Sequence, residues 1–225
     1  MNIKIVVKKS SELARAHHNL SLIEQRFINM CIGRKHYSEY VDEGTKYIVR
    51  GDRFAAEFSM TEREALRQFK DIQKSLPNKL VLLPESQSEP VYFVNEIVFK
   101  NNNEVYIKFD DEIIEHIGNL SSNFIRYDIS VISKLESSYS IRLYEILKTR
   151  AYDNAKWCYE VDILELKSIL GIVHGYTRNS DLNKMINSCV KEINKLTDIE
   201  VTVKYSKLNR TIIGYSFELS NKTKG

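Results

Sequence analysis

The sequence has few of the residues that mark disulfide-linked, metal-rich or highly flexible proteins. It contains 3 cysteines, 3 prolines and 8 glycines among 225 residues. Because Cys31, Cys158 and Cys189 form no CxxC pair, a zinc ribbon and a thioredoxin-type site are excluded. The small glycine and proline content excludes a long flexible linker or a collagen-like stretch.

Long apolar runs, paired histidines and nucleotide-binding motifs are also missing. The apolar runs are too short for a transmembrane helix, and the opening MNIKIVVKKSSE turns charged too soon for a signal peptide. None of the five histidines has a histidine partner at i+3 or i+4, as a helical metal site needs, and no G-x-x-x-x-G-K-[ST] motif occurs. We therefore expect a cytoplasmic protein without membrane contact, cofactor, metal or enzymatic activity.

The net charge of +3 conceals an uneven distribution along the chain. Residues 84–127 carry three basic and eight acidic side chains, whereas residues 176–225 carry nine basic and five acidic ones. Residues 1–83 are also net basic. Two basic regions separated by an acidic one favour two contact surfaces for a polyanion.

The same order of predicted elements occurs twice: a short strand, a short helix, a turn, a long helix and a β-hairpin. The first copy covers roughly residues 47–109 and the second roughly residues 159–219. This order is typical of a winged helix, a helix-turn-helix followed by a hairpin wing. We predict an α+β fold with two winged-helix domains in tandem, at 1–122 and 123–225.

Local signals predict further details of these elements. Ser21 followed by Glu24 predicts a capping box at the start of a helix, and Asp52 is expected to cap a short helix. Residues 91–100 are expected to form one strand, and the three asparagines at 101–103 to form the turn to the next strand.

The long helix of the first copy, predicted at 61–76, has a cationic stripe opposite its apolar side. Its members are spaced i, i+4, i+7 and i+11, and so fall within about 60° of one another on the helix: Arg63, Arg67, Lys70 and Lys74. Like charges in one stripe repel each other, which favours an anionic partner. For a single helix, a solvated surface with Glu62, Glu64 and Asp71 as partial neutralisers would be the favoured interpretation.

The long helix of the second copy, predicted at 180–197, is expected to expose only amides and ammonium groups: Asn183, Lys184, Asn187, Lys191, Asn194 and Lys195. The turn before it adds hydroxyls, a guanidinium and backbone N–H groups: Thr177, Arg178, Asn179 and Ser180. The second hairpin adds phosphate-binding side chains: Lys204, Lys207, Asn209 and Arg210. Such residues bond base edges and phosphates, so two helices of this kind predict binding to double-stranded DNA.

Residues 124–150, FIRYDISVISKLESSYSIRLYEILKTR, resemble the domain junction of the theta-type replication initiators (Rep proteins) of iteron plasmids. The specific part is SSYSIRLYEILK, whose matching residues are Tyr139, Ser140, Arg142, Leu143, Tyr144 and Leu147. A looser resemblance covers essentially the full chain, from VVKKSSELARA near the start to LKSILGI and the last strand. The chain departs from the family at Ile125, where many relatives have Thr, and it ends soon after the second hairpin.

The resemblance implies a plasmid replication initiator that binds tandem direct repeats, or iterons, at the origin as a monomer. It implies origin melting assisted by the host initiator ATPase, recruitment of the replicative helicase, and a dimer that represses its own gene. The N-terminal domain would dimerise and make auxiliary DNA contacts, while the C-terminal domain would make the principal sequence-specific ones. Arg142 and Tyr144 would hold the interdomain helix in place.

Three other functions use parts of the same pattern. A winged-helix transcriptional repressor would use the same helices without recruiting replication proteins. A rolling-circle origin nickase would need a His-hydrophobic-His pair, which the adjacent His17 and His18 do not provide. A protein-interaction scaffold would not require a face of asparagines and lysines. The junction motif favours the initiator.

Overall fold

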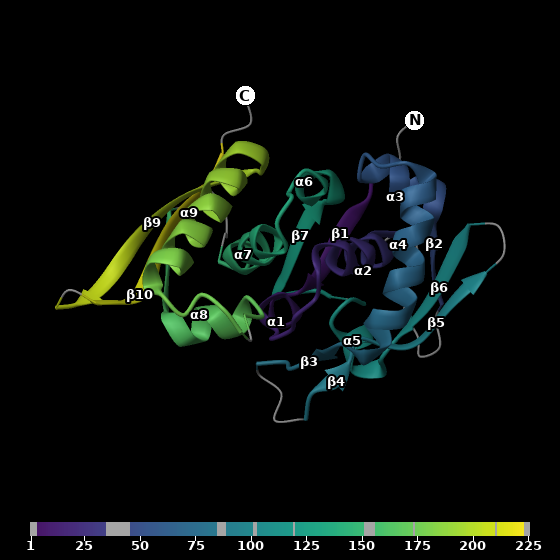
Figure 1. Ribbon diagram of the computed structural model, residues 1–225, viewed down its shortest axis with the longest axis horizontal. Coiled ribbons are helices and arrows are strands. Elements are labelled where there is room, and N and C mark those ends of the chain that lie inside the picture. The colour runs from purple at the N-terminus through teal and green to yellow at the C-terminus, as the bar shows by residue number, and fades with distance from the viewer. Residues whose placement is uncertain are drawn as a thin grey trace.

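The computed structural model describes residues 4–34, 46–84, 89–100, 103–118, 120–150, 156–172, 174–209 and 211–222. Two units, each a small sheet covered by helices, lie at the two ends of the molecule (Figure 1). A central group of helices and a two-stranded sheet lies between them.

The N-terminal unit packs three helices against a three-stranded sheet. The helices are α2 (Leu22–Arg34), α3 (Gly51–Glu57) and α4 (Glu62–Ser75). The sheet has the order β2-β6-β5 and consists of β2 (Tyr47–Arg50), β6 (Glu104–Phe109) and β5 (Val94–Lys100). Smaller elements complete it: α1 (Ser11–Arg15), a 3-10 turn (Leu76–Asn78), β3 (Leu80–Val81), β4 (Val91–Tyr92) and α5 (Asp111–Glu115). Strands β5 and β6 form the wing.

The C-terminal unit repeats this arrangement. Its elements are β8 (Trp157–Asp162), α8 (Ile163–Ile169), α9 (Asn179–Leu196), β9 (Ile199–Leu208) and β10 (Thr211–Asn221). The sheet has the order β8-β10-β9, and β9 and β10 form the wing. Helix α9 buries Leu182, Ile186 and Ile193, which recur at helical spacing. The prediction of two winged-helix units in an α+β fold is confirmed.

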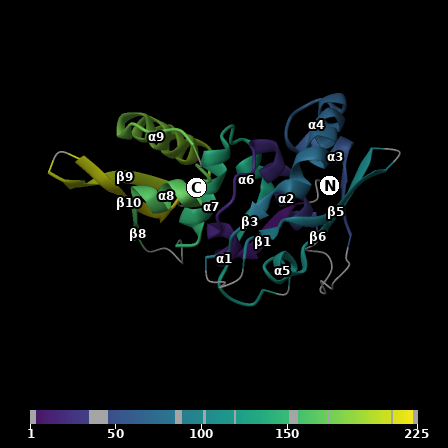
Figure 2. The ribbon, with the colours of Figure 1, turned by 60° about the horizontal axis from the view of Figure 1, so that its bottom comes forward.

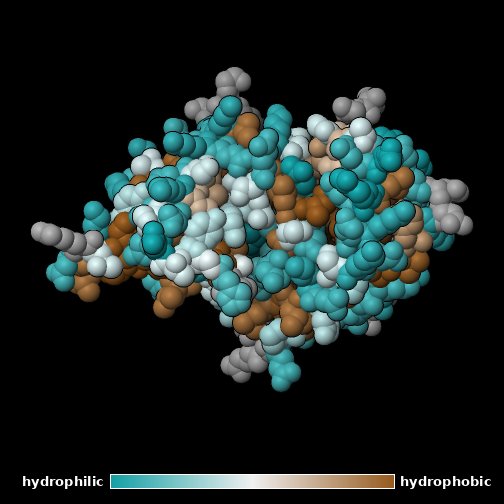
Figure 3. All heavy atoms as spheres, viewed as in Figure 1, coloured by the Kyte–Doolittle hydropathy of each residue, from teal (hydrophilic) through white to brown (hydrophobic). Residues whose placement is uncertain are grey.

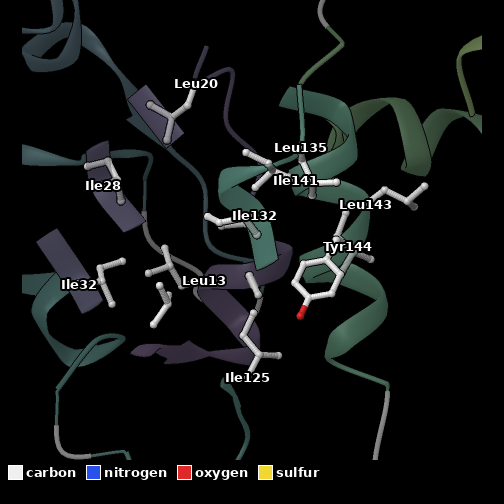
Figure 4. Packing of buried hydrophobic residues seen from close by; sticks show 14 of the residues in the cluster. Leu13, Leu20, Ile28, Ile32, Ile125, Ile132, Leu135, Ile141, Leu143 and Tyr144 are labelled. Carbon is white, nitrogen blue, oxygen red and sulfur yellow. The ribbon is translucent and has the colours of Figure 1, made fainter. Parts of the chain in front are cut away.

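The central group comprises β1 (Val6–Ser10), β7 (Phe124–Asp128), α6 (Ile129–Ser133) and α7 (Ser138–Lys148). Strand β7 pairs antiparallel with β1, so the chain returns to its own beginning before it enters the second unit. Helix α7 is buried along almost its whole length. Its Ile141, Leu143 and Tyr144 lie in one apolar cluster with Leu13 of α1 and Ile132 of α6 (Figure 4).

Arg142 of α7 joins the central helix to both units. Its guanidinium donates hydrogen bonds to the carbonyl oxygens of Ala14 (3.0 Å), Ala16 (2.6 Å) and Ile169 (2.9 Å). Burial lowers its pKa to about 10, so the group stays charged at neutral pH. Tyr144 donates a hydrogen bond of 2.9 Å to Asp198, at the end of α9. These contacts confirm that Arg142 and Tyr144 hold the interdomain helix.

Two local predictions are wrong and one is confirmed. Asp52 does not cap α3, because the helix begins at Gly51 with Arg50 as its N-cap residue. The Asp52 carboxylate accepts a hydrogen bond of 3.1 Å from Arg50. Residues 91–100 do not form one strand, because the buried Phe93 divides β4 from β5 and its N–H is bonded to the Lys79 carbonyl. The capping box at Ser21 is present, with both reciprocal hydrogen bonds to Glu24.

Some predictions concern residues that lie wholly or partly outside the described ranges. The turn at 101–103 is described only at Asn103, whose φ of 73° is left-handed. In the described part of the chain, no helix is long and apolar enough to cross a membrane. The same residues include no group of three or more His, Cys, Asp or Glu arranged to hold a metal ion.

Candidate nucleic-acid interface

The two long helices lie on the same side of the molecule. In Figure 2, α4 and α9 both run along the upper side, and the wings extend outward at the two ends. Each helix follows a shorter one, α3 or α8, and precedes a wing, which is the position of a recognition helix.

Helix α4 presents its cationic stripe to solvent as the sequence predicts. Its first turn is fixed by a capping box between Thr61 and Glu64, and hydrogen bonds from Thr61 lower the pKa of the Glu64 carboxyl. Its apolar side buries Ala65, Phe69 and Ile72, so the opposite side faces outward. All four predicted cations are exposed, and none forms an ion pair with a described residue: Arg63, Arg67, Lys70 and Lys74. Hydrophilic residues cover this helix in the space-filling view (Figure 3).

The segment that leads into α9 is held by contacts within its own unit and with the rest of the molecule. Gly171 has a φ of +71°, and a Cβ there would lie 2.1 Å from the carbonyl oxygen of His18, so only glycine fits. The ring of Tyr176 packs edge-on against Tyr139, with 6.0 Å between centroids, and Lys167 donates to the Tyr176 carbonyl. The turn that carries the predicted DNA-binding residues is thereby fixed.

The first turn of α9 is open to an anion. Arg178 is the N-cap residue, and no described side chain caps the helix, so backbone N–H groups remain available. The side chains of Thr177, Arg178 and Ser180 are exposed. Lys184 lies one turn further on, also exposed, with its ammonium 3.9 Å from Asp181.

The amide side of α9 differs from the prediction, because the wing covers it. Asn183 accepts a hydrogen bond of 2.6 Å from Tyr215 of β10, and Asn187 donates one of 2.7 Å to Tyr205 of β9. Asn179 donates to the carbonyl of Ile212. Asn194 likewise bonds the backbone of Val201 twice. These amides therefore stabilise the contact between helix and wing, and they are not a free exposed face.

The exposed stripe of α9 is displaced around the helix axis from the predicted one, away from the wing. Lys191 and Lys195 are exposed there, as predicted, together with Lys184. The sequence prediction missed Ser188, which is exposed in the same stripe, and Asp181 at its start. Tyr205 and Tyr215, one on each wing strand and opposite each other in the sheet, are the sequence signal that could have shown which side the wing covers.

The second wing presents an ion pair, exposed polar side chains and an exposed apolar one near its tip. Lys204 forms an ion pair with Glu218 on the neighbouring strand. Lys207 is exposed, and so is Asn209, which adopts a left-handed φ of 56° in the turn. Leu208 between them is 63% exposed. Arg210 lies outside the described residues.

Two family models match the sequence in consecutive segments. The model described as Initiator Replication protein, WH1, matches residues 6–148, and the one described as Initiator Rep protein, WH2, matches residues 162–219. The chain belongs to the initiator replication protein family. The WH1 match includes α6 and α7, so the family model assigns the central helix to the first domain.

Solved structures share the fold of this initiator. The Pi initiator protein in complex with iteron DNA has a TM-score of 0.80 and 21% sequence identity, with all of both chains covered. Domains 2 and 3 of RctB have a TM-score of 0.54 and 12% identity over 90% of this chain and 81% of that one. No curated protein matches the sequence.

Proposed function

We propose that this initiator binds double-stranded direct repeats (iterons) at a plasmid origin as a monomer, with α4 and α9 in successive major grooves. The observation that carries the proposal is the placement of two exposed cationic helices on one side of the molecule. A duplex presents successive major grooves on one face about 10 base pairs apart, which suits two such helices. The iteron DNA named for the Pi initiator supports this choice of ligand.

The two units have different roles in this proposal. The open first turn of α9, with Arg178, Ser180 and Lys184, reads base edges and supplies most of the sequence specificity. The stripe of α4 and the exposed Lys207 and Asn209 of the second wing bind phosphates and set the register. The protein is cytoplasmic and catalyses no reaction itself; after binding, the origin melts with the host initiator ATPase, and the replicative helicase is recruited. A dimer binds the promoter of its own gene and represses it.

A binding titration tests the central part of this function. Fluorescence anisotropy is measured with the direct repeats that flank the protein's own gene and with a duplex of the same bases in shuffled order, over a salt series. We expect a preference of about 10³-fold or more for the repeats and a steep fall of affinity with salt. Equal, weak binding to both duplexes by a sample diluted to the monomer would contradict the proposal.

A second measurement separates the initiator from a transcriptional repressor. Permanganate reactivity of unpaired thymines is followed on a supercoiled plasmid that carries the repeats. An initiator, with the host ATPase present, makes thymines beside the repeats reactive. A repressor binds the same repeats and leaves the duplex closed.

A further inference from the structure

The connection between α6 and α7 contacts both units. It consists of residues 134–137 and lies in the central group, between the unit that carries α4 and the unit that carries α9 (Figure 1). Its backbone is bonded from each side by one charged side chain, Arg26 of α2 and Glu192 of α9.

Arg26 forms the contact with the N-terminal unit. One guanidinium nitrogen donates hydrogen bonds to the carbonyl oxygens of Leu135 (2.9 Å) and Ser133 (3.3 Å). The guanidinium also lies over the ring of Phe58, 5.2 Å from its centroid. Phe58 is the C-cap residue of α3, and α4 begins shortly after it, at Glu62. The ring of Phe58 packs against Phe54, which contacts Phe69 of α4, so these aromatic rings link Arg26 to the first recognition helix.

Glu192 forms the contact with the C-terminal unit, and it belongs to the second recognition helix itself. Its carboxylate accepts a hydrogen bond of 2.6 Å from the backbone N–H of Glu136. Burial lowers the pKa of Arg26, while the carboxylates of Glu136 and Glu192 act in the opposite direction. The three charged groups thus lie close enough to interact.

These contacts form a short, continuous path between the recognition helices. From Phe69 of α4 it leads through the rings of Phe54 and Phe58 to Arg26 and the carbonyls of the connection. From there it continues through the N–H of Glu136 and the carboxylate of Glu192 to α9. Arg142, by comparison, bonds to carbonyls near the ends of α1 and α8 and reaches neither recognition helix directly.

We propose that Arg26 and Glu192 are positioning residues that fix the spacing of α4 and α9, and thereby the number of base pairs that the protein requires between the two halves of its DNA site. The inference rests on the proposed function, since it needs both helices on one duplex. One inserted base pair turns the second half-site by about 34° and moves it by about 3.4 Å. A rigid pair of helices cannot follow this change, whereas a loosened pair follows it in part.

The test uses the full-length protein and a duplex that the wild type selects from a randomised pool. Affinity is measured for this duplex and for the same duplex with one base pair inserted between the two halves of the site. The variants are Glu192→Ala, Glu192→Gln and Arg26→Ala, with Arg126→Ala, an exposed residue of β7, as control. Glu192→Ala and Glu192→Gln both lose the charge, but only Gln keeps an oxygen that can accept the N–H of Glu136.

We expect the loss of affinity caused by the inserted base pair to be at least about threefold smaller in Glu192→Ala and Arg26→Ala than in the wild type. Glu192→Gln and Arg126→Ala should keep the full wild-type loss. Thermal unfolding of each variant establishes that it is folded. An equal loss in the wild type and all variants would overturn the proposal, as would equal effects of the Ala and Gln variants at position 192. If the wild type selects no duplex at all, the proposed function fails and the inference fails with it.

Discussion

On α4 the four predicted cations stand in solvent, whereas on α9 the predicted amides are bonded to the wing of the same unit. The difference follows from the chemistry of the side chains. Four cations in one stripe repel each other, and none has a described ion-pair partner. An amide carries both a donor and an acceptor, so a neighbouring strand can satisfy it. The comparison teaches that a charged stripe predicts an exposed helix face more safely than an amide stripe does.

The largest effect on stability is expected when Arg142, which bonds to both units, is replaced. Arg142→Ala leaves three buried carbonyls without their donor and removes a cation that lies 3.7 Å from Glu145. We expect the free energy of unfolding to fall by about 3–5 kcal/mol in urea denaturation. Arg126→Ala, on the exposed side of β7, should change it by less than about 0.5 kcal/mol. If both variants unfold at the same urea concentration, the role given to Arg142 is wrong.

The next largest effect is on DNA affinity, and it distinguishes base contacts of α9 from phosphate contacts. Arg178→Ala or Lys184→Ala is expected to weaken binding to the direct repeats by about 1–3 kcal/mol where the side chain reads a base. Binding to the shuffled duplex should change much less. Anisotropy titrations on both duplexes measure the difference. Wild-type affinity in both variants would show that α9 is not the recognition helix.

Replacing cations of the α4 stripe should weaken binding to both duplexes alike, unlike the changes in α9. The double variant Arg67→Ala/Lys70→Ala removes two exposed cations without disturbing the buried side of the helix. If both bind phosphates, affinity at physiological salt should fall roughly 30-fold on repeat and shuffled duplexes alike, and the salt slope should decrease by about 2. A loss confined to the repeats would mean that α4 reads bases.

The smallest expected effect concerns the amides of α9. Asn187→Ala removes the hydrogen bond to Tyr205, and Tyr205→Phe removes the same bond from the other side. Each should lower the free energy of unfolding by about 1 kcal/mol, and the double variant should lose less than the sum. The salt slope of DNA binding should not change, because no charge is lost. Unchanged stability with weaker DNA binding in Asn187→Ala would instead place this amide on the DNA.

The sequence could predict what depends on neighbours along the chain. The order of elements, the Ser21 capping box and the outward direction of Arg63 and Arg67 follow from local periodicity and are confirmed. The division of residues 91–100 at Phe93 could not be predicted, because it depends on packing against residues distant in the sequence. The prediction that Asn183 lies on a freely exposed face is wrong for a related reason: a helical wheel shows which residues share a face, but not where the wing packs.

The contacts between the units were also beyond local analysis. Arg26 lies 107 positions from Ser133, and Glu192 lies 56 positions from Glu136. Arg26 and Glu192 lie in runs that resemble the family only loosely, and the resemblance gave them no role. The family resemblance pointed to Arg142 and Tyr144 because these lie in the hallmark run itself.

The most direct test of the account is a hydroxyl-radical footprint of the monomeric protein on one selected repeat. The two recognition helices on one side of the molecule predict two protected segments on the same face of the duplex, centred about 10 base pairs apart. Loss of the α4 cations should weaken one segment, and Arg178→Ala should weaken the other. A single protected segment, or two on opposite faces of the duplex, would contradict the account.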